Sequence, residues 1–152
     1  PAQRHNPALG HAILQAAGLR IRRDESGSLP PDASLYEIVA DFERRVIVER
    51  LEAAGARLEA GLRWAAFDAG REVGIARVAS LLTVFFRPTA PTTTDEAMAS
   101  DRAAFARFFA AMLERGVLLP PSQFEAWFVG LAHGSEDIEK TIQAAAEAFK
   151  SL

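Results

Sequence analysis

The chain has 152 residues, of which 49% are hydrophobic and 24% charged, values typical of a single globular domain. Its net charge of −3, without a basic block, disfavours nucleic-acid binding, and no segment is apolar for long enough to cross a membrane. The absence of cysteine excludes disulfides, thiolate metal sites and cysteine nucleophiles. We also expect a cytoplasmic location, because the first residues lack a secretion-signal pattern.

The N-terminal part predicts a short helix followed by a linker. Asn6 and Pro7 suit the start of a helix over residues 6–22, and residues 24–33 are rich in Gly and Pro. We therefore expect residues 1–33 to be separate from a main domain over residues 34–152.

A long amphipathic helix is predicted over residues 34–70. Ser34 and Glu37 have the spacing of a capping box, and apolar residues then recur every three or four positions. Gly70 suits a left-handed helix end. The pattern allows either one helix of up to nine turns or two helices broken near Gly55.

Strand character replaces helix character in the next segment. Residues 72–87 are rich in Val, Ile, Thr and Phe, which favours two strands, or one strand bent at Ala79 and Ser80. We expect residues 87–100 to form a loop, because Pro88 and Pro91 disfavour both a strand and a helix.

The C-terminal third predicts two helices and two short strands. A helix over residues 101–115 carries an apolar stripe that we interpret as core (Phe105, Phe108, Phe109, Met112, Leu113). Short strands are expected over 117–119 and 127–132, and Ser135 is expected to cap a last helix whose inward stripe contains Ile138, Ile142, Ala145 and Phe149. The predicted fold class is α+β: a small antiparallel or mixed sheet of three to four strands with helices packed on one face, preceded in the chain by the long amphipathic helix.

Few residues carry recognisable chemistry. The three histidines are scattered, which disfavours a metal site, and neither a nucleophile elbow nor a Gly-rich phosphate loop is present. Glu125 follows two prolines in a loop that could present a functional carboxylate, although a solvated loop residue is the simpler interpretation. His133 is predicted to be a turn residue that is hydrogen-bonded to backbone.

Several segments resemble one enzyme family. Residues 101–133, with the run Pro-Pro-Ser-Gln-Phe-Glu-Ala, resemble the C-terminal small domain of the glutamate-1-semialdehyde 2,1-aminomutase family. Those enzymes are pyridoxal-phosphate (PLP) proteins of the class III aminotransferase type, associated with tetrapyrrole precursor synthesis. Residues 48–62, 80–86 and 136–142 match in the same order, so the resemblance covers about 48–152. The family usually has Gly where this chain has Ala79.

The resemblance implies a domain that covers an active-site cleft and is not catalytic alone. The family's Schiff-base lysine belongs to a large domain, and the two lysines here, Lys140 and Lys150, match no family motif and are expected on the outer face of a helix. We therefore expect no covalently bound PLP. By resemblance, Ser122 and Phe124 lie on the substrate side, Glu125 is the carboxylate nearest the chemistry, and Phe124 and Trp127 help to exclude water.

The expected partners are a large PLP-binding domain or second subunit, and a second copy of the chain. An open apolar face would favour a homodimer. The alternative is a non-catalytic interaction or regulatory module that dimerises through helix 34–70. A DNA-binding fragment is a third interpretation, which the net charge of −3 disfavours.

Overall fold

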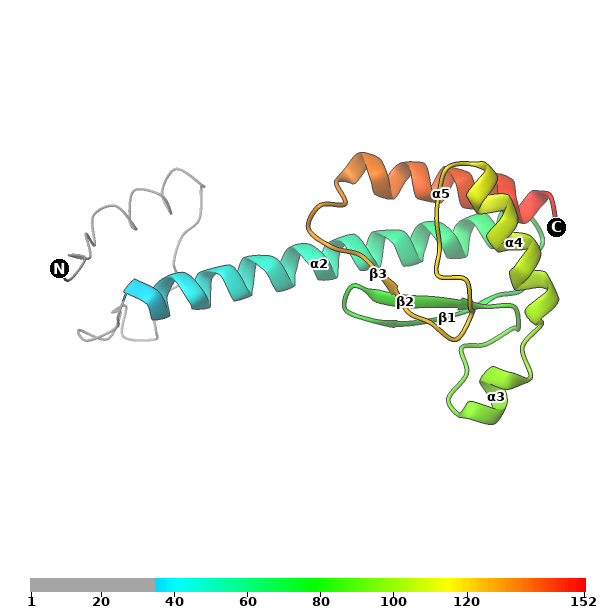
Figure 1. The fold of residues 1–152 in the computed structure, drawn as a ribbon, viewed down its shortest axis with the longest axis horizontal. Coiled ribbons are helices and arrows are strands. Elements are labelled where there is room, and N and C mark those ends of the chain that lie inside the picture. Colours follow the sequence, from blue (N-terminus) through cyan, green and yellow to red (C-terminus); the bar gives the residue numbers. More distant parts are fainter. Residues whose placement is uncertain (1–34) are drawn as a thin grey trace. The chain divides into compact units, whose positions relative to one another are not determined.

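The computed structural model describes residues 35–152, of which residues 49–152 form one compact unit (Figure 1). Its elements in chain order are α2 (Leu35–Asp68), β1 (Gly74–Val78), β2 (Leu81–Phe85), α3 (Thr94–Met98), α4 (Arg102–Glu114), β3 (Trp127–Phe128) and α5 (Ser135–Lys150). The predicted helix over 6–22, the linker over 24–33 and the Ser34 cap lie outside the described residues. The predicted domain boundary after residue 33 therefore stays a prediction.

The helix α2 runs without a break through Gly55, so the single-helix alternative is the one observed. Gly55 is required by packing, because a Cβ there would overlap the carbonyl oxygen of Ala79 in the neighbouring hairpin turn. Gly70 has φ +66°, and the amide of Arg71 donates to the carbonyl of Ala66 at 2.8 Å. This left-handed end confirms the predicted helix terminator.

The predicted bend at Ala79 and Ser80 is the two-residue turn of a hairpin, in which Val78 pairs with Leu81. Ala79 has φ +53°, while Ser80 does not have a positive φ, a pattern that favours glycine at the first turn position. Alanine thus holds the backbone shape for which the resembled family uses glycine. β3 pairs antiparallel with β2, which gives a three-stranded sheet in the order β1-β2-β3 and confirms the α+β class.

One face of the sheet supports the core. Strand alternation directs four buried side chains to this face: Ile75, Leu82, Val84 and Trp127. They belong to one core with buried side chains of the three longer helices (Leu62 of α2; Phe108 and Met112 of α4; Ala145 and Phe149 of α5). The rings of Phe108 and Phe149 stack with centroids 4.5 Å apart. The helices α2, α4 and α5 therefore lie on one face of the sheet, as predicted.

Strand predictions around β3 are partly wrong. Residues 117–119 form no strand, because the amide of Val117 donates to the carbonyl of Met112 and closes the end of α4. Leu118 points into solvent, while Leu119 is buried. β3 has two residues instead of the six predicted over 127–132. Beyond it, the amide of Val129 still donates to the carbonyl of Ser80 in the hairpin turn.

Three local predictions also need correction. The predicted loop over 87–100 contains α3, because both prolines precede Thr93, whose hydroxyl accepts from the Glu96 amide at 3.2 Å. The cap of α5 is Gly134 instead of Ser135, and its amide donates to the Asp137 carboxylate at 2.9 Å. Leu113 lies on the exposed side of α4, outside the core.

Candidate functional site

The segment between α4 and β3 crosses the sheet face that the helices leave open. Thr83 alternates with Leu82 and Val84, so its side chain points away from the helices. Its hydroxyl nevertheless donates to the carbonyl of Glu125 at 3.1 Å, and Thr83 is buried. The loop therefore lies over this part of the open face and is fixed to it.

The three residues predicted on the substrate side lie in one tight turn. The Ser122 hydroxyl accepts from the Phe124 amide at 3.2 Å, and the Ser122 carbonyl accepts from the Glu125 amide at 3.1 Å. The side chains of Phe124 and Glu125 are exposed, and that of Ser122 is partly so. The structure thus brings Ser122, Phe124 and Glu125 together, while their roles stay predictions.

Trp127 does not share that position. Its side chain is buried, alternates toward the helices and contacts the core, so it cannot help to exclude water at an open cleft. Of the two aromatic residues expected to do so, Phe124 is the one with an exposed side chain, and its role stays a prediction.

Buried polar groups without partners concentrate in this same segment. Gln123 is 2% exposed, and neither atom of its amide forms a hydrogen bond. With the Trp127 indole nitrogen, it supplies three of the four such buried atoms among the side chains that the structure describes. Each such group typically costs about 1–3 kcal/mol, and uncompensated costs of this kind are typical of functional sites. Gln123 could not be predicted from the sequence, because nothing in the spacing of the loop shows that this side chain is buried.

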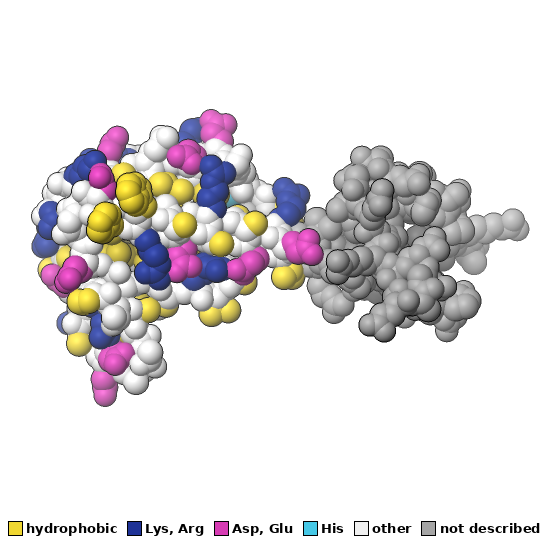
Figure 2. All heavy atoms as spheres, turned by 180° about the vertical axis from the view of Figure 1, so that it is seen from behind, with side chains coloured by type: hydrophobic (Ala, Val, Ile, Leu, Met, Phe, Trp, Pro, Cys, Tyr) yellow, Lys and Arg dark blue, Asp and Glu magenta, His cyan; other side chains and the backbone are white. Residues whose placement is uncertain are grey.

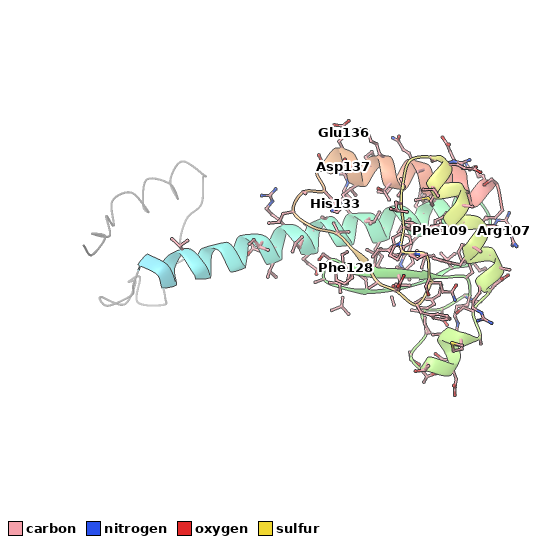
Figure 3. All side chains as sticks on the ribbon, in the orientation of Figure 1. Arg107, Phe109, Phe128, His133, Glu136 and Asp137 are labelled. Atoms are coloured by element: carbon pink, nitrogen blue, oxygen red, sulfur yellow. The ribbon has the colours of Figure 1, made fainter. Side chains whose placement is uncertain are left out.

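An apolar row remains uncovered next to the loop. Val78, Leu81 and Phe128 are direct cross-strand neighbours on β1, β2 and β3, on the same face as Thr83. Val78 is 78% exposed, Phe128 is 72% exposed, and Leu81 is also exposed. We call these three residues the sheet row; Phe128 is labelled in Figure 3. The sheet row could not be predicted from the sequence, because its members become neighbours only through the strand register.

A second exposed apolar surface lies on the outer side of α2. Trp64 is 68% exposed and Phe67 is 73% exposed, and their ring centroids are 5.8 Å apart. Ala53, Ala56 and Ala60 precede them on the same helix face, and we call these five residues the α2 stripe. Figure 2 shows hydrophobic side chains following α2 between charged ones. These five residues recur with helical spacing on a different face of α2 from the buried Leu58, Leu62 and Ala65. This second apolar spacing was visible in the sequence and was not recognised there.

A charged cluster links α2 to β1. The Glu59 carboxylate accepts from Arg77 at 2.7 Å and from Arg63 at 2.8 Å, and Arg77 also donates to Glu52 at 2.8 Å. Hydrogen bonding to Arg77 is the main reason that the pKa of Glu59 is lowered, against an opposing effect of burial. The pKa of Arg77 is raised by the same contact. This cluster ties the helix to the sheet and does not reach the loop.

Both lysines lie on the outer surface, as predicted. The Lys140 side chain is 65% exposed and pairs with Glu136 at 2.8 Å, while that of Lys150 is 59% exposed and pairs with Asp68 at 2.8 Å. A lysine that forms a Schiff base with PLP needs a desolvated or otherwise tuned amine. Neither amine of this chain fits that requirement, because both are exposed and paired with a carboxylate.

The remaining candidates have structural roles. The ring Nδ1 of His133 accepts from the Gly130 amide at 2.9 Å in the turn between β3 and α5, which confirms the turn prediction (Figure 3). Among the side chains that the structure describes within residues 35–152, no group of three or more His, Cys, Asp or Glu residues is arranged to bind a metal. Across that same range, no helix combines the length and apolarity that spanning a membrane requires.

Comparison with known proteins now gives this geometry a context. No protein-family model matches the chain. Among solved structures, the FumI protein of a Sphingopyxis species, in its PLP internal aldimine form, superposes with a TM-score of 0.57 at 28% identity, over 77% of this chain and 26% of that one. A glutamate-1-semialdehyde aminomutase from Pseudomonas aeruginosa, in complex with PMP, gives a TM-score of 0.61 at 20% identity, over 94% and 34%. The fold is that of a segment of PLP-dependent enzymes.

Sequence similarity identifies one family within this class of PLP-dependent enzymes. Glutamate-1-semialdehyde 2,1-aminomutase from Thermomicrobium roseum is 48% identical over 103 residues, which are 68% of this chain and 24% of the relative. The chain therefore belongs to the glutamate-1-semialdehyde 2,1-aminomutase family, which confirms the resemblance drawn from the sequence. The solved structures that contain PLP or PMP agree with the expected cofactor of the family. The chain spans about a quarter of the length of the curated relatives it matches.

Proposed function

We propose that the chain is the small domain of a PLP-dependent aminomutase or transaminase, and that it covers the active-site cleft of a large domain. The observation that carries the proposal is the open sheet face, where the loop with Ser122, Phe124 and Glu125 lies beside the uncovered sheet row. The similarity to about a quarter of each relative supports the same interpretation. Two exposed lysines support the need for a separate cofactor-binding domain.

The large domain docks on the sheet row in this proposal. Burying Val78, Leu81 and Phe128 removes apolar surface from water and places the adjacent turn at the edge of the interface. Phe124 then shields the cleft from water, and the Glu125 carboxylate orients the substrate amine or takes part in proton transfer. The proposed substrate is glutamate 1-semialdehyde, in tetrapyrrole precursor synthesis, in the cytoplasm, with the chain present as a homodimer.

A domain replacement tests this function. Residues 48–152 replace the matched segment of the Thermomicrobium roseum aminomutase, and we expect the chimera to bind PLP and isomerise glutamate 1-semialdehyde. In the chimera, Glu125→Gln is expected to lower kcat about a hundredfold, as removal of a positioned acid or base does. Glu114→Gln, which changes an exposed carboxylate on α4, is the matched control and should leave kcat unchanged. A folded chimera that binds PLP without turnover would contradict the proposal.

The isolated chain gives a second, independent measurement. Mixed with PLP, it should show no visible absorbance band of a lysine aldimine, and borohydride reduction should leave its mass unchanged. A band that disappears in Lys140→Arg or Lys150→Arg would refute the proposed dependence on another domain.

The α2 stripe favours a second candidate, a non-catalytic interaction module that associates through this helix. Exposed Trp64 and Phe67 are the specific observation for it, because large aromatic side chains are enriched at interfaces. An inactive chimera, combined with self-association of the isolated chain, would favour this second function over the first.

A further inference from the structure

The α2 stripe has a regular spacing together with a gradient of side-chain size. Its members, Ala53, Ala56, Ala60, Trp64 and Phe67, are separated by three, four, four and three residues. This sequence of intervals reads the same in both directions from Ala60. Small side chains occupy one half and large exposed aromatic side chains occupy the other.

A second copy fits this pattern when two α2 helices pack antiparallel about a twofold axis at Ala60. Residues equally distant from Ala60 then lie opposite each other across the interface. Phe67 of each copy meets Ala53 of the other, and Trp64 meets Ala56. Each large side chain thus faces a small one, which is the complementarity that close helix packing needs.

The charges beside the stripe permit this approach. Arg57 and Arg63 lie along its two edges and would meet across the axis as like charges. Within each copy, however, Arg57 pairs with Glu139 at 2.9 Å and Arg63 pairs with Glu59 at 2.8 Å. Because both arginines have an acidic partner, their repulsion is reduced.

The size of the stripe sets the expected strength. A buried aromatic residue contributes about 150–250 Å² of buried surface, so Trp64 and Phe67 of both copies together supply roughly half the area of a standard interface. We expect a reversible dimer that dissociates on dilution, unlike an obligate assembly.

We propose that the α2 stripe is a self-association surface on which two copies of this chain pack antiparallel about Ala60. The proposal gives the proposed homodimer its interface and does not depend on PLP or on a large domain. Both tests below use the chain alone, so their outcome is separate from that of the domain replacement.

Sedimentation over about a hundredfold range of concentration tests the surface. The chain should shift from monomer to dimer, and Trp64→Ala with Phe67→Ala should weaken association about thirtyfold or more, as loss of central aromatic residues does. Phe128→Thr, on the sheet row, is the matched aromatic control and should leave association unchanged. A monomer at every concentration, or a dimer that the double variant leaves intact, would overturn the proposal.

Cross-linking tests the register, and the chain is suited to it because it contains no cysteine. Helices that pack about 8–10 Å apart bring facing Cα atoms within disulfide range. Ala60→Cys lies on the proposed axis and should form a disulfide-linked dimer under mild oxidation. Ala53→Cys, opposite Phe67, should form little. Equal cross-linking of both variants, or none by Ala60→Cys while the chain sediments as a dimer, would exclude this packing.

Discussion

The α2 stripe and the sheet row are both apolar and exposed, but they arise in different ways. The stripe lies within five turns of one helix, so its spacing is written in a continuous stretch of sequence. The row takes one residue from each of three strands, and its members become neighbours only through the hairpin register and the pairing of β3. A local surface can therefore be inferred from sequence periodicity, whereas a surface built across strands requires the register.

The helix and the sheet that carry these two surfaces contact each other through residues that belong to neither surface. Gly55 of α2 touches the hairpin turn at Ala79, and Glu59 binds Arg77 on β1. These contacts hold the helix against the sheet without contributing to either exposed surface. Substitutions can therefore alter one surface, the other, or the junction between them.

Among the substitutions that distinguish the two surfaces, the largest effect is expected from the sheet row. In the chimera, Phe128→Thr keeps a side chain suited to strands but removes an apolar anchor, and should lower activity about thirtyfold through weaker docking. The unfolding free energy of the isolated chain should change by about 1 kcal/mol or less, since Phe128 is exposed.

Trp64→Thr provides the matched comparison, as an exposed aromatic residue on the α2 stripe. It should leave the activity of the chimera unchanged while weakening association of the isolated chain. If Phe128→Thr and Trp64→Thr reduced activity equally, the proposed division between the two surfaces would be wrong.

The junction is expected to respond to Gly55→Ala. The new methyl group meets the backbone of the hairpin turn, so we expect a loss of about 2 kcal/mol in unfolding free energy, despite alanine's better helix propensity. Denaturant unfolding of the chain measures it.

Gly61→Ala, also on α2, is the control for that experiment. The nearest atoms to its methyl group belong to the side chain of Ile142, whereas Gly55→Ala meets backbone, so the cost should be smaller. A larger loss for Gly61→Ala would show that the helix depends on α5 more than on the hairpin.

Ala79→Gly should stabilise the hairpin turn by about 1 kcal/mol, because glycine adopts a positive φ without the steric cost that alanine has. A higher midpoint of denaturant unfolding would show it. Both exposed surfaces should keep their properties, measured as association of the chain and activity of the chimera. A destabilised variant would mean that the added freedom of the unfolded chain outweighs the relief of strain.

The smallest expected effect is the pH dependence of the Glu59 contact. The pKa of Glu59 is lower in the folded chain than in the unfolded chain, so its stabilising contribution is present above the unfolded-state pKa of about 4.3 and is lost as the pH falls through the lowered folded-state pKa. Comparing unfolding of the chain and of Glu59→Gln between neutral and acidic pH should show the difference shrinking toward low pH. A constant difference would mean that the charge of Glu59 does not contribute.

The parts of the fold that could be predicted are those with local signals. The end of α2 at Gly70, the turn at Ala79 and the stripe of α5 follow from spacing and special residues near in sequence. The strand predicted over 117–119 failed because the apolar run Val117–Leu119 serves the end of α4 instead. The helix α3 departs from the predicted loop because prolines disfavour a helix only near their own positions, and α3 begins after both of them.

The candidate site shows the same limit. Resemblance to a family selected Ser122, Phe124 and Glu125, and the structure brings them into one turn. It could not show that Trp127 points to the opposite side, since strand alternation fixes that direction only once the pairing with Leu82 is known. Gln123 was missed because its burial comes from contacts that no spacing reveals.

The hydrogen bond from Thr83 to Glu125 has one more consequence. The main chain of Glu125 is anchored through its carbonyl to Thr83 and through its amide to Ser122, whereas its carboxylate forms none of the hydrogen bonds or ion pairs found among the described side chains. The main-chain hydrogen bonds thus fix the position of residue 125, while its side chain alone supplies the chemistry. Evolution, or an engineer, can exchange the reactive group here without having to rebuild the scaffold that presents it.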